Sequence, residues 1–429
     1  MAKLYVGVAR TPITPPVGVD LTGYAGRPTG CTGIHDDLYA KALVLSDGRT
    51  SAAIVSLDLL SLNDEQIARI REDATARTGI PSENMLIGAS HTHSGPATQP
   101  LRACGTPDDA YVDALVAWIG DVLVEAAGDL RPASIGYCSA PTDIAVNRRY
   151  RGPDGAIRIA ENVGGVADHE VGILRIADDV GYPLAIIFNH ACHAVVMDGN
   201  NLLVSADWPG AAAQCVERET GATALFLQGC CGNINPREQG SFEAVERLGD
   251  TAARSVLSTL ASIPAVSDAR IVVAREVIHL PLQPPDVDAA RAELAEAEQR
   301  FREKGSKAST VEIQLMEAYR DLADAVAAIA DDYPKFVSFE IQRVSVGDAH
   351  IIALPGEVFV EIGLAIKALK PNVLVAGYAN GNIGYVPTRS AFDEGGYEVN
   401  VAWKLYGKQM ITPDAEELII ASARRLLNE

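Results

Sequence analysis

Residues 85–96 read MLIGASHTHSGP. The first five residues form an unbroken apolar run, which predicts a buried β-strand, and the closing glycine and proline predict a turn. His91 and His93 follow the strand two positions apart, so in an extended backbone both imidazoles face the same point. Neutral imidazole is a common metal ligand, and metal centres of this kind carry out hydrolytic chemistry. The alternative is a histidine pair that only caps turns or binds backbone carbonyls.

Other apolar runs also end in polar loops that contain glycine. The residues with chemical groups in these loops are His190, His193, Asn233, Asn235, Glu357, Tyr378 and Tyr385. In an open α/β sheet, ligands bind beyond the carboxyl ends of the strands, where loops that are distant in sequence meet. We therefore expect one site built from these loops.

Two of these loops have local alternatives. His190 and His193 share a face only in a helix, so we expect one to be a metal ligand and the other a core or supporting histidine. Glu357 follows Pro355 and Gly356, where we expect a helix to begin. The helix dipole would keep its carboxylate ionised, as a metal ligand requires, and the alternative is an ordinary charge at a helix N-terminus.

The order of the predicted elements indicates an α/β fold with mixed, largely parallel sheets flanked by helices. Strands are predicted over residues 38–45, 52–57, 85–89, 133–138, 170–176, 184–188, 222–227, 349–354 and 372–376. Helices are predicted over residues 65–78, 110–127, 211–219, 242–260, 357–369 and 414–427, and a polar turn over 147–150. With no internal repeat or low-complexity linker, residues 1–429 are expected to form a single domain. Residues 286–330, rich in Ala, Glu, Arg and Leu, predict an inserted helical hairpin with no visible chemistry.

Composition restricts the partners of the protein. The formal net charge is −20 and 48% of the residues are hydrophobic. An acidic surface repels nucleic acids and anionic membranes, so we expect neither nucleic-acid binding nor stable membrane association. The first residues lack a signal-peptide pattern and the seven cysteines are scattered, so we expect a cytoplasmic protein with reduced thiols. A homo-oligomeric state stays open.

Two further groups of residues carry weaker signals. Cys230 and Cys231 lie between a predicted strand and a helix, where a thiol nucleophile would fit, but no base lies near them in sequence. We expect them to pack as small buried residues. A second metal site near His35, Asp58 or Asp207 stays open.

Five motifs occur in order along the chain. They are SHTHSGP at residues 90–96, NHACH at 189–193, GNINP at 232–236, LPGE at 354–357 and GYVPT at 384–388. The set resembles the catalytic domain of neutral/alkaline ceramidases, and the resemblance covers nearly the whole chain. It implies a zinc amidohydrolase.

The resemblance also implies roles for single residues. The Zn²⁺ ligands would be His91, His193, Glu357 and Tyr385. His93 would be a supporting or substrate-facing histidine, and Arg148 would lie near the scissile group. The residues alone would instead make Tyr385 an oxyanion donor.

The chain departs from the ceramidase pattern in two places. Ceramidases carry GDVSP where residues 232–236 read GNINP, so Asn235 stands where a serine is sometimes assigned as the nucleophile. An amide cannot act as that nucleophile, so we expect Asn235 to position groups or to stabilise an oxyanion. Ceramidases also continue into an immunoglobulin-like domain and are exported. This chain is expected to lack both features, which favours a substrate other than ceramide.

The expected function is zinc-dependent hydrolysis of a C–N amide bond in a small, soluble N-acyl substrate by metal-activated water. His93 would pass a proton to the leaving amine. One alternative is an esterase or lactonase that uses the same zinc site. The other is a non-catalytic binding protein that keeps the fold, which the asparagine at position 235 could indicate.

Overall fold

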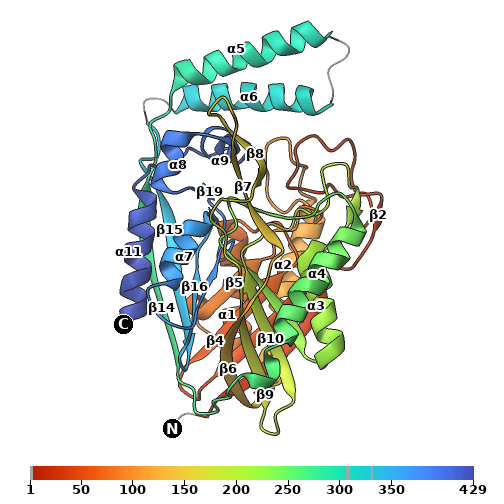
Figure 1. The fold of residues 1–429 in the computed structure, drawn as a ribbon, viewed down its shortest axis with the longest axis vertical. Helices are drawn as coiled ribbons and strands as arrows, with labels where there is room; N and C mark the ends of the chain where they lie inside the picture. The colour runs from red at the N-terminus through yellow and green to blue at the C-terminus, as the bar shows by residue number, and fades with distance from the viewer. Residues whose placement is uncertain (1–2, 306–309, 330–331) are drawn as a thin grey trace.

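The computed structural model describes residues 3–305, 310–329 and 332–429. A large sheet contains β1 (Tyr5–Pro12), β3 (Tyr39–Ser46), β4 (Ser51–Leu57), β5 (Met85–Ala89), β6 (Arg131–Pro141), β9 (Glu170–Asp178), β10 (Pro183–His190) and β12 (Thr223–Gln228). Its strand order is β12-β10-β9-β6-β1-β3-β4-β5. A smaller sheet contains β14 (Ile271–Pro281), β15 (Phe336–Val346), β16 (Ala349–Ala353) and β18 (Val373–Ala376), in that order. The two sheets lie together in the centre of the molecule (Figure 1).

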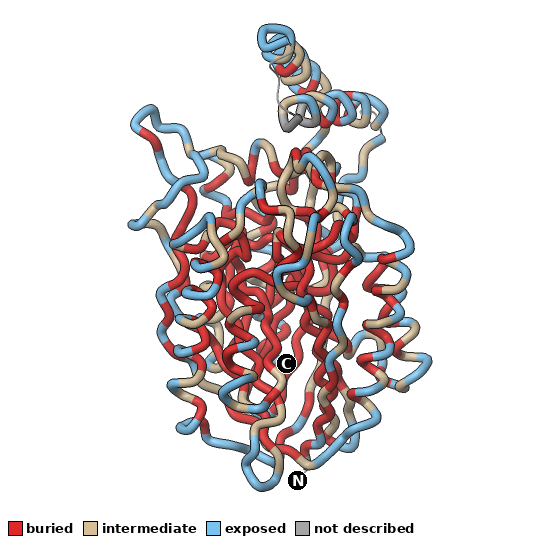
Figure 2. Tube along the Cα trace, turned by 90° about the vertical axis from the view of Figure 1, so that its right-hand side faces the viewer, coloured by how far each residue is buried: buried red, intermediate tan, exposed pale blue. Residues whose placement is uncertain are grey.

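The two sheets pack face to face, and the large sheet is buried on both faces. In β3, Leu43 and Leu45 join the apolar cluster between the sheets, whereas Ala42 and Val44 join the cluster beneath the outer helices. This alternation follows from the two-residue period of a strand. Burial of both faces explains why the strands read as continuous apolar runs. Figure 2 shows the buried strands filling the centre of the molecule.

Helices cover the two outer faces. One part of the large sheet packs against α1 (Asp64–Thr78) and α2 (Asp109–Gly128), and another part against α3 (Asp207–Thr220) and α4 (Phe242–Leu257). The smaller sheet packs against α7 (Val360–Lys367) and α11 (Ala415–Asn428). The ends of α1 show why it forms there: Asn63 and Gln66 make a capping box, and Gly79, with φ of 74°, ends the helix. The fold is therefore mixed α/β with helix-flanked sheets, as the sequence predicts.

The expected predominance of parallel strands was wrong. Among the described residues, neighbouring strands of the two main sheets are parallel in the pairs β4–β5, β10–β12 and β16–β18, and the other pairs are antiparallel. Short connections such as that between β3 and β4 favour hairpins, which are antiparallel. The carboxyl ends of the parallel pairs nevertheless meet. The Gly377 amide donates to the carbonyl oxygen of Gln228 (3.0 Å), and the Ala89 amide donates to that of Tyr378 (3.1 Å).

Two helices, α5 (Val287–Lys304) and α6 (Thr310–Ala328), lie side by side at one end of the molecule (Figure 1). Residues 306–309 and 330 of the expected hairpin lie outside the described residues. Ala290, Leu322 and Val326 form a small apolar cluster with Trp403, which belongs to the short helix α10 (Ala402–Leu405). None of the described helices has the length and apolarity that a membrane crossing requires.

The turn expected at residues 147–150 was wrong. These residues belong to β7 (Ala145–Arg151), which pairs with β8 (Ile157–Asn162) on one side and with β13 (Ile234–Pro236) on the other. Asn147, Arg148 and Arg149 are polar but buried, so this strand lacks the apolar pattern on which the expectation depended.

Candidate metal centre and active site

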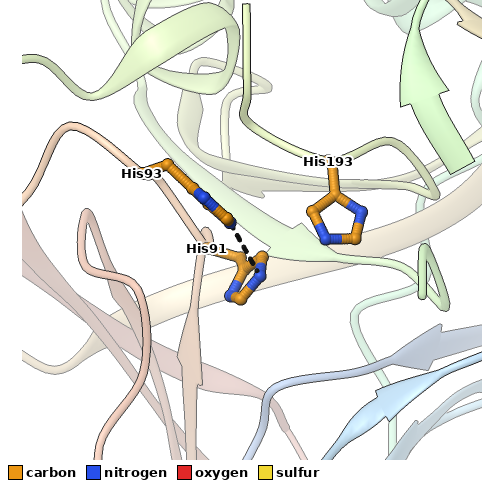
Figure 3. A group of neighbouring side chains, drawn as sticks. All are labelled: His91, His93 and His193. Carbon is orange, nitrogen blue, oxygen red and sulfur yellow. Dashed lines mark hydrogen bonds between the residues drawn. The ribbon is translucent and has the colours of Figure 1, made fainter. Parts of the chain in front are cut away.

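Three histidines from two distant parts of the chain converge at one point (Figure 3). His91 and His93 follow β5, and His193 follows β10. The Nε2 atoms of His91 and His93 are 3.1 Å apart, and one ring nitrogen from each of the three residues lies within 4.8 Å of the others. Among the residues that the structure describes, one group of three or more His, Cys, Asp or Glu side chains lies close enough together to hold a metal ion, and it is made of His91, His93 and His193.

The backbone brings His91 and His93 together differently from the expectation. His91 has φ of 64°, in the left-handed region, so the extended backbone assumed for residues 91–93 was wrong. Tyr378, which stacks on the His91 ring with centroids 4.0 Å apart, also has positive φ, at 51°. Such conformations are unfavourable for large side chains and are concentrated at functional sites. The strained pair marks the centre independently of its sequence motif.

Hydrogen bonds orient two of the three imidazoles. His91 Nδ1 lies 2.9 Å from the carbonyl oxygen of Leu60, and His193 Nδ1 lies 2.6 Å from that of Cys231. Metal-binding histidines are usually held in this way, with the other ring nitrogen free to bind the ion. His93 Nδ1 has no such partner, and His93 is the least buried of the three. The geometry suits His91 and His193 to metal binding and leaves His93 with an unpartnered Nδ1.

Glu357 completes the centre. Its Oε2 atom lies 3.3 Å from Nε2 of His91 and 3.3 Å from Nε2 of His193. The expected helix start at Glu357 was wrong, because Glu357 lies in β17 (Glu357–Val358), which pairs with β19 (Tyr385–Val386), and α7 begins only at Val360. This pairing places Glu357 directly opposite Tyr385.

The environment favours the protonation states that a metal needs. Burial by itself raises the pKa of Glu357, but His91 and His193 outweigh it and hold the pKa well below its usual value. Burial and the charge of Arg148 lower the pKa of His193 to about 4. Burial raises the pKa of Tyr385, while Arg148 opposes this effect. An ionised carboxylate beside a neutral imidazole is a suitable pair of metal ligands.

Arg148 connects Tyr385 to Asn235. Its Nη2 donates to the hydroxyl oxygen of Tyr385 (2.9 Å), and its Nη1 donates to Oδ1 of Asn235 (3.2 Å). Nη1 also lies 3.5 Å from Nε2 of His193. The structure therefore brings Arg148, Tyr385, His193 and Asn235, the asparagine of the unusual GNINP motif, into one network.

The remaining candidates lie elsewhere or have structural roles. His190 Nδ1 bonds the carbonyl oxygen of Glu170 (2.9 Å), away from the three histidines. Asn233 accepts from the Val360 amide at the start of α7. Cys231 lies 3.2 Å from the hydroxyl of Tyr378, and its thiol, like that of Cys230, has a pKa raised by burial, so neither cysteine is poised as a nucleophile.

The residues considered for a second metal are already engaged. His35 Nδ1 lies 2.8 Å from Asp36. Asp58 accepts from the Tyr39 amide (2.9 Å), and Asp207 accepts from the Trp208 amide (2.7 Å). Both carboxylates therefore accept hydrogen bonds from backbone amides, which is a structural role.

Sequence reasoning missed three residues around the centre. The hydroxyl of Tyr406 donates to Oε1 of Glu357. The ring of Tyr397 packs edge-on against Tyr385, with centroids 5.9 Å apart. Glu398 accepts from Arg148 Nε at 3.0 Å. All three lie in residues 397–406, a segment without a motif, so no pattern in the sequence indicated them.

The donor set fits a metal ion. Two imidazoles with carbonyl-anchored Nδ1 atoms lie beside a buried carboxylate, and the phenol of Tyr385 is linked to His193 through Arg148. This is a combination of N and O ligands suited to Zn²⁺. Glu357 has no lysine or arginine in direct contact among its described bonds. A cation between the histidines and Glu357 would therefore balance a buried negative charge.

The fold and this centre define a class: a mixed α/β protein with a buried histidine–carboxylate site at the ends of parallel strands. Comparison with known proteins gives the family. The family described as neutral/alkaline non-lysosomal ceramidase, N-terminal, matches residues 4–246. This match spans more than half of the chain, and the protein belongs to the neutral/alkaline ceramidase family.

Individual relatives agree with this assignment. Neutral ceramidase 1 of Arabidopsis thaliana is 28% identical over 230 residues, which are 50% of this chain and 29% of the relative. Neutral ceramidase of Pseudomonas aeruginosa is 25% identical over 237 residues, covering 51% of this chain and 34% of the relative. The chain thus spans about a third of these relatives. The crystal structure of the Pseudomonas aeruginosa enzyme matches with a TM-score of 0.74 at 19% identity, over 100% of this chain and 75% of that one, which shows the shared fold.

Proposed function

We propose that the protein is a metal-dependent hydrolase of an amide bond, with His91, His193, Glu357 and Tyr385 as the metal ligands. The observation that carries the proposal is the position of Glu357 Oε2, 3.3 Å from Nε2 of both His91 and His193. We assign zinc because its preferred ligands match this set. When bound, zinc supplies Lewis acidity, which polarises a carbonyl oxygen and makes water more acidic.

The protein groups around the ligands supply the rest of the chemistry. Arg148 and Asn235 lie beside Tyr385 and His193, where the guanidinium can stabilise negative charge that develops on a carbonyl oxygen. His93 holds an unbonded Nδ1 and a pKa lowered by burial and by His91. As a neutral imidazole it can accept a proton and deliver it to the leaving amine.

The proposed class of substrate is inferred from the names of the relatives. The curated relatives are named neutral ceramidases, and a solved relative is titled as a ceramidase complexed with C2. We therefore propose a lipid amide of the ceramide type in place of the small soluble amide expected from the sequence. The seven cysteines are free, which supports the proposal of a reducing compartment.

Hydrolysis assays test the proposed function. Purified protein is incubated with a ceramide, with a short-chain water-soluble N-acyl analogue and with the corresponding ester, before and after metal chelation. We expect amine release from the ceramide that stops on chelation and returns with zinc. Turnover of the ester alone would indicate an esterase. Unchanged amide hydrolysis in His91→Ala and His193→Ala would overturn the metal-dependent mechanism.

A further inference from the structure

The nitrogens of the Arg148 guanidinium have different partners. Its terminal nitrogens Nη1 and Nη2 contact Asn235 and Tyr385 within the site. Its Nε donates to a different residue, at Oε1 of Glu398 (3.0 Å). A flexible side chain of this length has many rotamers, so a contact at Nε decides where the terminal nitrogens point.

Glu398 is enclosed and binds two arginines. It is fully buried and lies in the short helix α9 (Tyr397–Asn400). While Oε1 accepts from Arg148, Oε2 accepts from Arg149 Nη1 (2.8 Å). Arg149 is held in turn by the carbonyl oxygen of Gly395 (2.8 Å) and by Glu394 (3.1 Å).

The backbone is shaped for this arrangement. Consecutive side chains of a regular strand point to opposite faces, yet Arg148 and Arg149 reach the same carboxylate. The pairing of β7 with β8 shifts register between Asn147 and Arg149, and such a bulge redirects a side chain. Gly396, two residues before Glu398, has φ of 98°, and a Cβ there would lie 2.9 Å from Ile157 Cγ2 and 3.1 Å from Arg149 Nη1. The register shift is consistent with both arginines reaching Glu398.

We propose that Glu398 is a positioning residue that directs the Arg148 guanidinium toward Tyr385 and the substrate carbonyl. A glutamine at this position offers one acceptor oxygen where Glu398 offers two, and its amide nitrogen is a donor that would face one of the two arginine nitrogens. The effect of Glu398 on turnover rests on the proposed function, but its effect on Arg148 geometry does not.

The test compares Glu398→Gln with Glu394→Gln, a matched control that contacts Arg149 and Arg151 but not Arg148. Crystal structures of both variants give the first measurement. In Glu398→Gln we expect loss of the hydrogen bond between Arg148 Nη2 and Tyr385, and in the control we expect it to remain. An Arg148 side chain that stays in place in Glu398→Gln would overturn the inference, whatever the activity.

Kinetics give the second measurement. We expect Glu398→Gln to lower kcat by about 10- to 100-fold with little change in KM or metal content. In an Arg148→Ala background the same change should have no further effect, because Glu398 acts through Arg148. Additive losses in the double variant would show that Glu398 acts by another route. If the wild-type protein hydrolyses none of the substrates, the proposed function is contradicted. The positioning role of Glu398 is then tested by the crystal structures alone.

Discussion

Asn235 and His193 both contact Arg148, but they contribute to different parts of the proposed chemistry. Removing an oxyanion-stabilising group typically lowers kcat by about a hundred- to a thousand-fold. We expect Asn235→Ala to show a loss of this size and to keep its zinc. His193→Ala should lose both zinc and activity, because a ligand is missing.

Assays with parallel metal analysis measure the two effects. If Asn235→Ala and His193→Ala are folded and equally inactive, and the former still holds zinc, then Asn235 takes a direct chemical part. Asn235→Ser should not accumulate an acyl-enzyme, since a hydroxyl needs a base placed to activate it.

His190 predicts a pH dependence that is separate from the site. Burial lowers its pKa from 6.5 to about 4. Below pH 6.5 the unfolded chain binds a proton that the folded protein does not, so the free energy of unfolding decreases as pH falls from 6.5 toward 4. The loss attributable to this residue reaches about 3 kcal/mol.

The variant His190→Asn isolates this contribution. Its amide nitrogen can replace the donor that faces Glu170, but it does not titrate. Urea denaturation of the metal-free protein between pH 4 and 7 should give a flatter pH dependence for the variant than for the wild type. Equal slopes would contradict a neutral, buried His190.

At the scale of single residues, the motifs predicted most of the site but not its support. His91, His193, Asn235 and Tyr385 follow recognisable strand–loop patterns, and all of them meet. Tyr406 and Glu398 could not be predicted, because a tyrosine or a glutamate in a short helical segment has many ordinary roles. Their importance depends on tertiary contacts with Glu357 and Arg148.

At the scale of elements, the hairpin α5–α6 contacts α10, which lies next to the site. Leu322 of α6 packs with Trp403, and Lys404 binds Glu293 of α5, while Tyr406, just beyond, contacts Glu357. No chemistry was expected of the hairpin from its residues. Its contacts with α10 lead us to expect that it supports the segment from which Tyr406 reaches the Glu357 carboxylate.

Leu322→Ala tests this support. Truncating a buried leucine typically destabilises a protein by about 2–5 kcal/mol. We expect faster hydrogen exchange in residues 402–406 and a lower melting temperature. Ile313→Ala, on an exposed part of the same helix, is the control and should change neither by much. Unchanged exchange in residues 402–406 of Leu322→Ala would show that the hairpin is independent of the site.

Elements were predictable where the hydrophobic period was clear. The helix expected over residues 65–78 spans Asp64–Thr78, and the strand expected over 52–57 spans Ser51–Leu57. The prediction was wrong for β7 and for Glu357, where polar groups are buried for function. Buried arginines remove the apolar signal of a strand, and a Pro-Gly pair resembles a helix start although a short strand follows.

At the scale of the whole molecule, antiparallel pairs build most of both sheets, while the site lies where parallel pairs end. The rule that ligands bind at the carboxyl ends of parallel strands therefore located the site although the sheets are largely antiparallel. From the sequence, the net charge of −20 argues against nucleic acids and anionic membranes as partners. The pairing of strands could not be predicted, because it depends on contacts between distant residues that local patterns do not encode.

The central claim is that one zinc ion binds between His91, His193 and Glu357. Anomalous X-ray diffraction at the zinc absorption edge, on crystals of protein purified without added chelator, tests it most directly. We predict one strong anomalous peak per chain, in contact with Nε2 of His91, Nε2 of His193 and the Glu357 carboxylate, and no peak in crystals of His193→Ala. The absence of a peak at this position after zinc is supplied, or a peak held by other residues, would contradict the account.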